Sequence, residues 1–323
     1  MKKPVKKVLV ALPSVGRLTG LDIIETLRTN LKKRGYTPVF YLGMTSKHVE
    51  GNEPFQAAVR RMTDVKIAET PLDGYGAGVM AAINQGTEKE KPHFVLCLPD
   101  DYELEARHMH KMLDPLANKK ATVTIGAWDK VSWRTFPVPQ YLTEIHTSVL
   151  ATYANPHFRP RRSNPHVGTA IIDALAQKKA FQTYTGMFAF TPKSWGNVHS
   201  TLKQLFQRHK NTILQPPIEP AILLAALKCG EKVAQPKIPR RFEHPIPRTA
   251  EEVARHRLTR GKQFREAAEV IVEFLENTGQ KSKIPHALDY VQRVMPRIEK
   301  RDVLRKGQRP IERGRTMSAM PTK

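Results

Sequence analysis

Two adjacent carboxylates stand directly after a short apolar segment of this chain. Residues Phe94–Leu98 are apolar, and Pro99, Asp100 and Asp101 follow them. A run of about four to eight apolar residues that ends in a turn signal predicts a buried strand. Carboxylate oxygens are the ligands that hard divalent cations prefer. The segment therefore predicts a metal or phosphate site at a strand end, although aspartates are also favoured where a helix begins.

The first half of the chain alternates apolar strand patterns with amphipathic helix patterns. Such repeated β-α-β units predict a mostly parallel sheet with helices on both faces. The chain is long enough, at 323 residues, to bury a full core. The predicted strands are Val8–Leu12, Val39–Leu42, Val65–Ala68, Phe94–Leu98 and Ala121–Ala127, and the predicted helices are Leu21–Leu31, Pro54–Met62, Val79–Asn84 and Glu105–Leu116.

Three polar segments fall where predicted strands end. In a parallel sheet, ligands bind beyond the carboxyl ends of the strands. Glycines in the loop 73–78 would let backbone amides approach a phosphate, although ordinary turns need glycine as well. The loop lacks the lysine of a Walker motif, so an NTPase is not expected. The residues at this edge are Pro13, Ser14, Asp73, Gly74, Gly76, Asp100 and Asp101.

The second half of the chain is less regular. Residues 128–168 are rich in Pro, Trp, His and Arg, and the cluster 155–166 within them is typical of a long functional loop. Beyond Pro296 the chain is basic and has almost no core-forming residues, so we expect a disordered tail. The remaining expected elements are a strand pair over Phe181–Phe190, helices over Lys193–Arg208, Pro220–Lys228 and Glu251–Asn277, and a strand over Lys232–Ile238.

The charge of the chain is unusual. It holds 53 Lys and Arg residues against 30 Asp and Glu residues, a net charge of +23. This excess favours polyanionic partners such as nucleic acid, an anionic membrane surface or phosphorylated substrates. Cys97 and Cys229 show no paired spacing, and no segment has the length of a signal sequence core or a membrane span. We expect a soluble, cytoplasmic protein with reduced cysteines.

Several segments together, in their order, resemble a known family. Before residue 102 they are a strand that ends at Pro13-Ser14, a glycine loop that opens a helix, and a strand that ends at Pro99-Asp100-Asp101. After it they are the glycine-containing segment 184–190, an acidic helix start at Ile218-Glu219 and the segment 233–244, which ends in a histidine. This order resembles the GT-A glycosyltransferases, in particular glycosyltransferase family 2 and the glucosyl- and mannosyl-3-phosphoglycerate synthases.

The resemblance implies a fold and a division into domains. The fold would be α/β, a GT-A, Rossmann-like, mostly parallel sheet flanked by helices, with a C-terminal helical extension. Residues 1–245 would form the glycosyltransferase domain, with a donor-binding half at 1–128 and an acceptor-binding half at 129–245. The helical extension would cover 246–296, and the basic tail 297–323.

The resemblance also implies roles for residues. The chain would move a sugar from a UDP- or GDP-sugar to an unknown hydroxyl acceptor, and the edge residues named above would bind this donor. Asp101 and His244 would hold Mn²⁺ or Mg²⁺, because such a cation stabilises a departing diphosphate. Glu219 would be the general base of an inverting reaction, or otherwise only a first-turn helix acid. Phosphate or acceptor contacts would come from Arg159, Arg161, Arg162, Gly186, Arg240 and Arg241, although these arginines also fit a solvated basic surface.

The sequence leaves other functions open. The basic charge is also compatible with a nucleic-acid-binding protein, or with a glycosyltransferase that acts on modified nucleic acid. A sugar nucleotidyltransferase would share a similar sheet. Pro99 stands where the family usually has the first Asp of an Asp-x-Asp motif, so an inactive family member is a further alternative.

Overall fold

The computed structural model describes most of the chain. The described residues are 6–101, 105–129, 132, 136, 138–155, 158, 181–183, 185–239 and 249–300. Their centre is a seven-stranded sheet with the strand order β3-β2-β1-β4-β7-β5-β8. The strands are β1 (Lys6–Pro13), β2 (Tyr36–Thr45), β3 (Val65–Thr70), β4 (Phe94–Cys97), β5 (Val123–Ile125), β7 (Phe188–Phe190) and β8 (Val233–Ala234).

The sheet is mostly parallel, as the β-α-β pattern predicts. β1 pairs in parallel with β2 on one side and with β4 on the other, whereas β7 runs antiparallel to β4 and β5. Side chains alternate between the two faces of a strand. On β1, Val8 and Val10 enter one core cluster, and Leu9 and Ala11 enter the other. Both faces of the sheet are therefore buried, which confirms the predicted α/β class.

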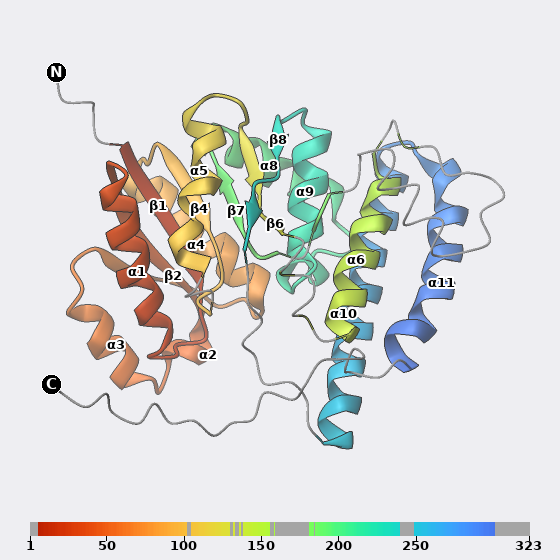
Figure 1. The fold of residues 1–323 in the computed structure, drawn as a ribbon, viewed down its shortest axis with the longest axis horizontal. Helices are drawn as coiled ribbons and strands as arrows, with labels where there is room; N and C mark the ends of the chain where they lie inside the picture. The colour runs from red at the N-terminus through yellow and green to blue at the C-terminus, as the bar shows by residue number, and fades with distance from the viewer. Residues whose placement is uncertain are drawn as a thin grey trace, which may run out of the picture.

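Helices cover the two faces of the sheet (Figure 1). Each of the two core clusters combines side chains from one face of the sheet with side chains from the helices that cover that face. One face carries α1 (Gly20–Lys33), α3 (Glu53–Arg60), the 3-10 turn η1 (Glu105–His108) and α5 (His110–Ala117), and the other carries α4 (Tyr75–Glu90), α8 (Pro192–Leu205) and α9 (Ile218–Lys228).

A third group of helices packs beside α9. α6 (Val138–Tyr153), α10 (Ala250–Asn277) and α11 (Ile284–Lys300) pack against one another and lie side by side (Figure 1). α10 begins with a capping box, in which the Thr249 hydroxyl accepts from the backbone N–H of Glu252. None of the described helices is long and apolar enough to cross a membrane.

The helix α6 lies in the irregular segment 128–168, for which the sequence predicted no helix, and of the expected loop over 155–166 only residues 155 and 158 are described. The α6 side chains Leu142, Val149 and Leu150 are buried in the core cluster shared with α10 and α11. Pro139 lies in the first helical turn, where its missing N–H has no intrahelical partner to lose. Pro139 therefore lies at a helix start.

Other elements are shorter or longer than the sequence predicts. The expected strand over Lys232–Ile238 divides into β8 and β9 (Lys237–Ile238), because β8 pairs with β5 and β9 pairs with β6 (Ala127–Trp128) in a separate sheet. The predicted strand pair over residues 181–190 has only β7 among its described residues. The segment expected to be one helix over 105–116 is η1 followed by α5, and α11 continues through Pro296 to Lys300.

A close backbone contact joins β2 to α4. Gly43 of β2 faces Gly78 of α4, and a Cβ added at Gly43 would overlap the backbone carbonyl group of Gly78. Backbone atoms cannot move aside as a flexible side chain can. The distance between this strand and this helix therefore depends on the absence of a side chain at Gly43.

We predict that Gly43→Ala lowers the free energy of unfolding by about 1–3 kcal/mol, as overpacking of a core does. The measurement is urea unfolding followed by circular dichroism. The matched control is Gly196→Ala in α8, where an added Cβ meets nothing within 4 Å. That change is expected to stabilise by up to about 1 kcal/mol, because alanine is the better helix former. Equal stability of the two variants would contradict the prediction.

Candidate functional site

The site lies where the order of the strands reverses. From β1 the chain proceeds outward through β2 to β3, and it then returns to place β4 on the other side of β1. A crevice forms at such a switch point, at the carboxyl ends of the two central strands. The hydroxyl Oγ of Ser14 donates to Oδ2 of Asp100 at 2.5 Å and accepts from the backbone N–H of Gly16 at 3.0 Å. Ser14 therefore fixes the loop after β1 to the loop after β4.

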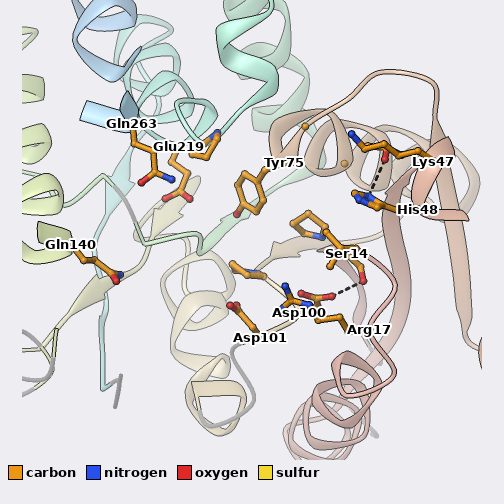
Figure 2. Close-up of a pocket in the computed structure, with 18 of the residues that line it drawn as sticks. Ser14, Arg17, Lys47, His48, Tyr75, Asp100, Asp101, Gln140, Glu219 and Gln263 are labelled. Atoms are coloured by element: carbon orange, nitrogen blue, oxygen red, sulfur yellow. Dashed lines mark hydrogen bonds between the residues drawn. The ribbon is translucent and has the colours of Figure 1, made fainter. Parts of the chain in front are cut away.

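A cleft of about 410 Å³ opens at this switch point (Figure 2). We call its two sides the sheet-edge wall and the helical wall. Tyr75, at the start of α4, stands between them (Figure 2). The sheet-edge wall comprises Pro13, Ser14, Arg17, Lys47, Gly74, Pro99, Asp100 and Asp101, and the helical wall comprises Gln140, Glu144, Glu219, Arg260 and Gln263.

The two aspartates of the sheet-edge wall have different environments. Burial raises the pKa of the Asp100 carboxyl group, and the nearby charge of Asp101 raises it further. The hydrogen bond from Ser14 and the charge of Arg17 act in the opposite direction. Asp101 is exposed, and both aspartates line the cleft. Asp100 is thus held by the loop after β1, while Asp101 faces solvent.

The glycine loop has a packing role that the sequence does not reveal. Gly74 adopts a φ of 114°, in the region that favours glycine, and it caps the start of α4. Gly76 is buried, and a Cβ there would overlap the carbonyl oxygen of Ile213 in the 3-10 turn η3 (Thr212–Leu214). Gly74 lines the cleft, whereas Gly76 lets α4 pack against η3.

Glu219 reaches the cleft from the first turn of α9. Its side chain is 8% exposed, and Oε2 accepts a hydrogen bond of 2.8 Å from the backbone N–H of Gly186. Gly186 has a φ of 66° and lies two residues before the start of β7. Glu219 and Gly186, both predicted as site residues, are thus in direct contact through this hydrogen bond.

Sequence reasoning missed most of the helical wall. Glu144 is 4% exposed, and its two carboxylate oxygens accept from Nε1 of Trp128 at 3.1 Å and from Nε2 of Gln140 at 2.8 Å. Nη1 of Arg260 donates to Oε1 of Gln263 at 2.9 Å. These side chains come from α6 and α10, which are far from the motifs in the sequence. Arg17 and Tyr75, which are not part of the helical wall, are the lining residues that lie next to segments predicted from the sequence.

The structure brings several of the predicted residues together. Pro13, Ser14, Gly74, Asp100, Asp101 and Glu219 all line the cleft. Asp73 does not line the cleft, but its Oδ1 forms an ion pair of 2.9 Å with Nζ of Lys47, which does. Gly76 and Gly186 pack behind the lining, as described above. The predicted residues that lie outside the described part of the chain are Arg159, Arg161, Arg162, Arg240, Arg241 and His244.

The residues present fit a hard divalent cation held largely by a ligand. Mg²⁺ and Mn²⁺ prefer oxygen donors, and Mg²⁺ is often bound by one or two carboxylates plus substrate phosphates. Asp101 supplies an exposed carboxylate in the cleft, and Asp100 lies next to it. No three His, Cys, Asp or Glu side chains gather into a ligand set among the described residues. A metal here would therefore take Asp101 together with oxygens of the bound substrate.

Comparisons with known proteins give weak similarities only. No family model and no curated protein sequence matches the chain. The glucosyl-3-phosphoglycerate synthase of Mycobacterium tuberculosis, solved with Mn²⁺ and UDP-glucose, is 12% identical over 86% of this chain and 80% of that chain, with a TM-score of 0.45. The mannosyltransferase PcManGT of Pyrobaculum calidifontis, solved with GDP-mannose and Mn²⁺, is 13% identical over 93% and 73%, with a TM-score of 0.41. TarS of S. aureus is 11% identical over 91% and 82%, with a TM-score of 0.37. At such values the similarities assign no activity to this chain.

We predict that Ser14→Ala lowers the free energy of unfolding at pH 7 by about 1.5–3 kcal/mol, because it removes a hydrogen bond to a charged group. The loss is expected to shrink as the pH falls through the raised pKa of Asp100, since the bond then joins two neutral groups. Urea unfolding as a function of pH measures both effects.

The control for this prediction is Ser46→Ala. The Ser46 hydroxyl donates to the backbone carbonyl of Thr70 at 3.3 Å, a bond between neutral groups. Its removal is expected to lower the free energy of unfolding by about 0.5–1.5 kcal/mol at every pH. A pH-independent loss for Ser14→Ala as well would show that Asp100 is not the charged partner.

Proposed function

We propose that this chain is a metal-dependent glycosyltransferase that moves a sugar from a nucleoside-diphosphate sugar to a hydroxyl acceptor. One observation carries the proposal: a single cleft at the switch point of the sheet has Asp101 on its sheet-edge wall and Glu219 on its helical wall. Transfer to a hydroxyl needs stabilisation of a departing anion on one side and a base on the other. The two walls supply these two requirements.

The sheet-edge wall suits the donor. Arg17 and Lys47 are cations that line it, and Lys47 is held in place by its ion pair with Asp73. Cationic side chains of this kind bind diphosphate oxygens. The Ser14–Asp100 pair next to them offers polar groups for the sugar of the nucleoside. We assign Asp100 to contact the sugar of the nucleoside, because its hydrogen bond with Ser14 holds the carboxylate in place at the edge of the cleft.

A divalent cation on Asp101 would neutralise the charge that develops on the departing diphosphate. Asp101 is suited to hold it because its carboxylate is exposed at the edge of the cleft. His244 remains the proposed second ligand from the chain. Mn²⁺ and Mg²⁺ are both compatible with this donor set.

Glu219 is the proposed general base. Its carboxylate takes the proton of the acceptor hydroxyl while the acceptor oxygen forms a bond to the anomeric carbon of the donor. The bond between that carbon and the diphosphate oxygen breaks with its electron pair, and the nucleoside diphosphate leaves. The hydrogen bond from Gly186 N–H holds Oε2, so that the carboxylate is oriented before the acceptor binds. This assignment applies to a reaction that inverts the anomeric centre.

The alternative functions have less support from the site. A nucleotidyltransferase needs no base for a sugar hydroxyl, and Glu219 would then have no chemical role. A nucleic-acid-binding role rests on the net charge of +23 and on the basic tail, of which only residues 297–300 are described. UDP- and GDP-sugars are the first donors to test, because the sequence resembles enzymes that use them.

We predict that Glu219→Gln lowers kcat by about 10²–10⁴-fold, the contribution of a general base, and leaves the Kd of the donor within twofold. Glutamine retains an oxygen for the Gly186 N–H, so the fold is expected to be preserved. Transfer of radiolabelled sugar, with donor titration in parallel, measures the two quantities.

Glu231→Gln is the matched control for that prediction. Glu231 follows α9 and accepts hydrogen bonds from the side chains of Thr122 and Asn197, away from the cleft. The kcat of the Glu231→Gln variant is expected to equal that of the unchanged protein. A variant Glu219→Gln that transfers sugar at the normal rate would exclude Glu219 as the base.

We also predict that EDTA raises the Kd of UDP- or GDP-sugar at least tenfold and that Mn²⁺ restores it. Asp101→Ala is expected to remove this dependence on Mn²⁺, whereas Asp114→Ala on the exposed face of α5 retains it. Isothermal titration calorimetry with and without the metal gives the values. A donor Kd that changes neither with EDTA nor with the Asp101 substitution would rule out a metal at this position.

A further inference from the structure

We infer that Tyr75 is a sugar-binding residue, whose ring forms the apolar surface against which the transferred sugar of the donor rests. This inference rests on the proposed glycosyltransferase function. Tyr75 lines the cleft, and its ring points toward the space between Asp101 and Glu219 (Figure 2). The anomeric carbon lies in this space in the proposed reaction, because the diphosphate leaves on the Asp101 side and the acceptor is activated by Glu219. The transferred sugar would therefore lie next to the Tyr75 ring.

The start of α4, which carries Tyr75, touches both walls of the cleft. A Cβ added at Gly76 would lie 3.0 Å from Cβ of Ile218, the first residue of the helix that carries the proposed base. A Cβ added at Gly78 would lie 3.5 Å from Cβ of Pro13, which belongs to the sheet-edge wall. Tyr75 is therefore mounted at the point where the donor side of the cleft meets the side of the base.

The backbone at Tyr75 is fixed on both sides. Gly74 has a φ of 114°, and a Cβ there would overlap the carbonyl oxygen of Leu214. The carbonyl oxygen of Gly74 accepts a hydrogen bond of 3.2 Å from the backbone N–H of Gly78. The Tyr75 side chain is partly buried and packs against the core cluster on the α4 face of the sheet. A ring that is held in this way needs little further ordering when a ligand binds.

The chemistry of the ring suits a sugar. A pyranose carries hydroxyl groups around its edge and C–H bonds on its faces, and an aromatic ring offers a large apolar surface to such a face. Ligand pockets commonly combine aromatic side chains with a few polar groups that fix the orientation of the ligand. Among the described residues that line the cleft, Tyr75 is the one Phe, Tyr or Trp. The ring therefore supplies an apolar surface that the carboxylates of Asp101 and Glu219 cannot supply.

The nucleotide part of the donor has other contacts. Arg17, Lys47 and the Ser14–Asp100 pair, all on the sheet-edge wall, are the groups proposed above to hold the diphosphate and the nucleoside. A nucleoside diphosphate without a sugar would therefore bind without help from Tyr75, whereas a nucleoside-diphosphate sugar would use the ring. A comparison of the two ligands isolates the contact with the sugar, since a loss of folding would weaken the binding of both.

The test is isothermal titration calorimetry on the full chain with Mn²⁺, with UDP and UDP-glucose as one pair of ligands and GDP and GDP-mannose as the other. Tyr75→Leu is expected to raise the Kd of the nucleotide sugar about tenfold, as the loss of an aromatic contact does, while the Kd of the nucleotide stays within twofold. Tyr75→Phe keeps the ring and is expected to leave both values within twofold. The control is Tyr36→Leu, with both values unchanged, because Tyr36 is also partly buried but begins β2, at the end opposite to the cleft.

A second variant without a ring, Tyr75→Met, keeps the test valid if leucine is not tolerated at this position. The inference is overturned if both variants bind the nucleotide sugar as tightly as the unchanged protein does, or if both lose the nucleotide and the nucleotide sugar by the same factor. A Tyr75→Phe variant that binds the nucleotide sugar as weakly as Tyr75→Leu also overturns it, since the ring would then not be the contact. Absence of nucleotide-sugar binding by the unchanged protein would instead refute the proposed function, so the two failures are distinguishable.

Discussion

The parallel pairing of β1 with β2 on one side and β4 on the other is the constraint on which the rest of this structure depends. Because β1 is central, the loops that follow β1 and β4 emerge next to each other at one edge of the sheet. The hydrogen bond from Ser14 to Asp100 joins these loops. This junction places Ser14, Asp100 and the adjacent Asp101 at the sheet-edge wall.

The cleft depends equally on elements that do not belong to the sheet. α9 brings Glu219 to it, and α6 and α10 bring the amides and the second carboxylate. The group of α6, α10 and α11 is held by its own buried side chains, among them His146 of α6, whose Nδ1 contacts the hydroxyl of Tyr290 in α11 at 2.8 Å. Side chains on packed helices of this kind are held more precisely than side chains on loops.

Small residues set the distances within this arrangement. Gly43 and Gly78 let β2 and α4 approach to backbone contact, and Gly76 lets the start of α4 rest against η3. Tyr75 is placed between the two walls by the same helix start (Figure 2). The glycine loop therefore acts first through packing. The packing of Gly76 against η3 fixes the start of α4, and this places Gly74 at the cleft.

The sequence alone determined the alternation of strands and helices from β1 to β4 and the edge of the sheet at which the cleft lies. Those properties follow from local patterns, because alternating apolar runs bury themselves against neighbouring elements and parallel strands share a carboxyl edge. The pair Pro99-Asp100, the loop at Gly74 and the helix start at Glu219 were found in this way. Only the tertiary structure decided that α6 is a helix and that α6 and α10 form the opposite wall of the cleft. Gln140 and Gln263 contact Glu144 and Arg260 within their own helices, but only the packing of α6 and α10 beside α9 places these side chains at the cleft.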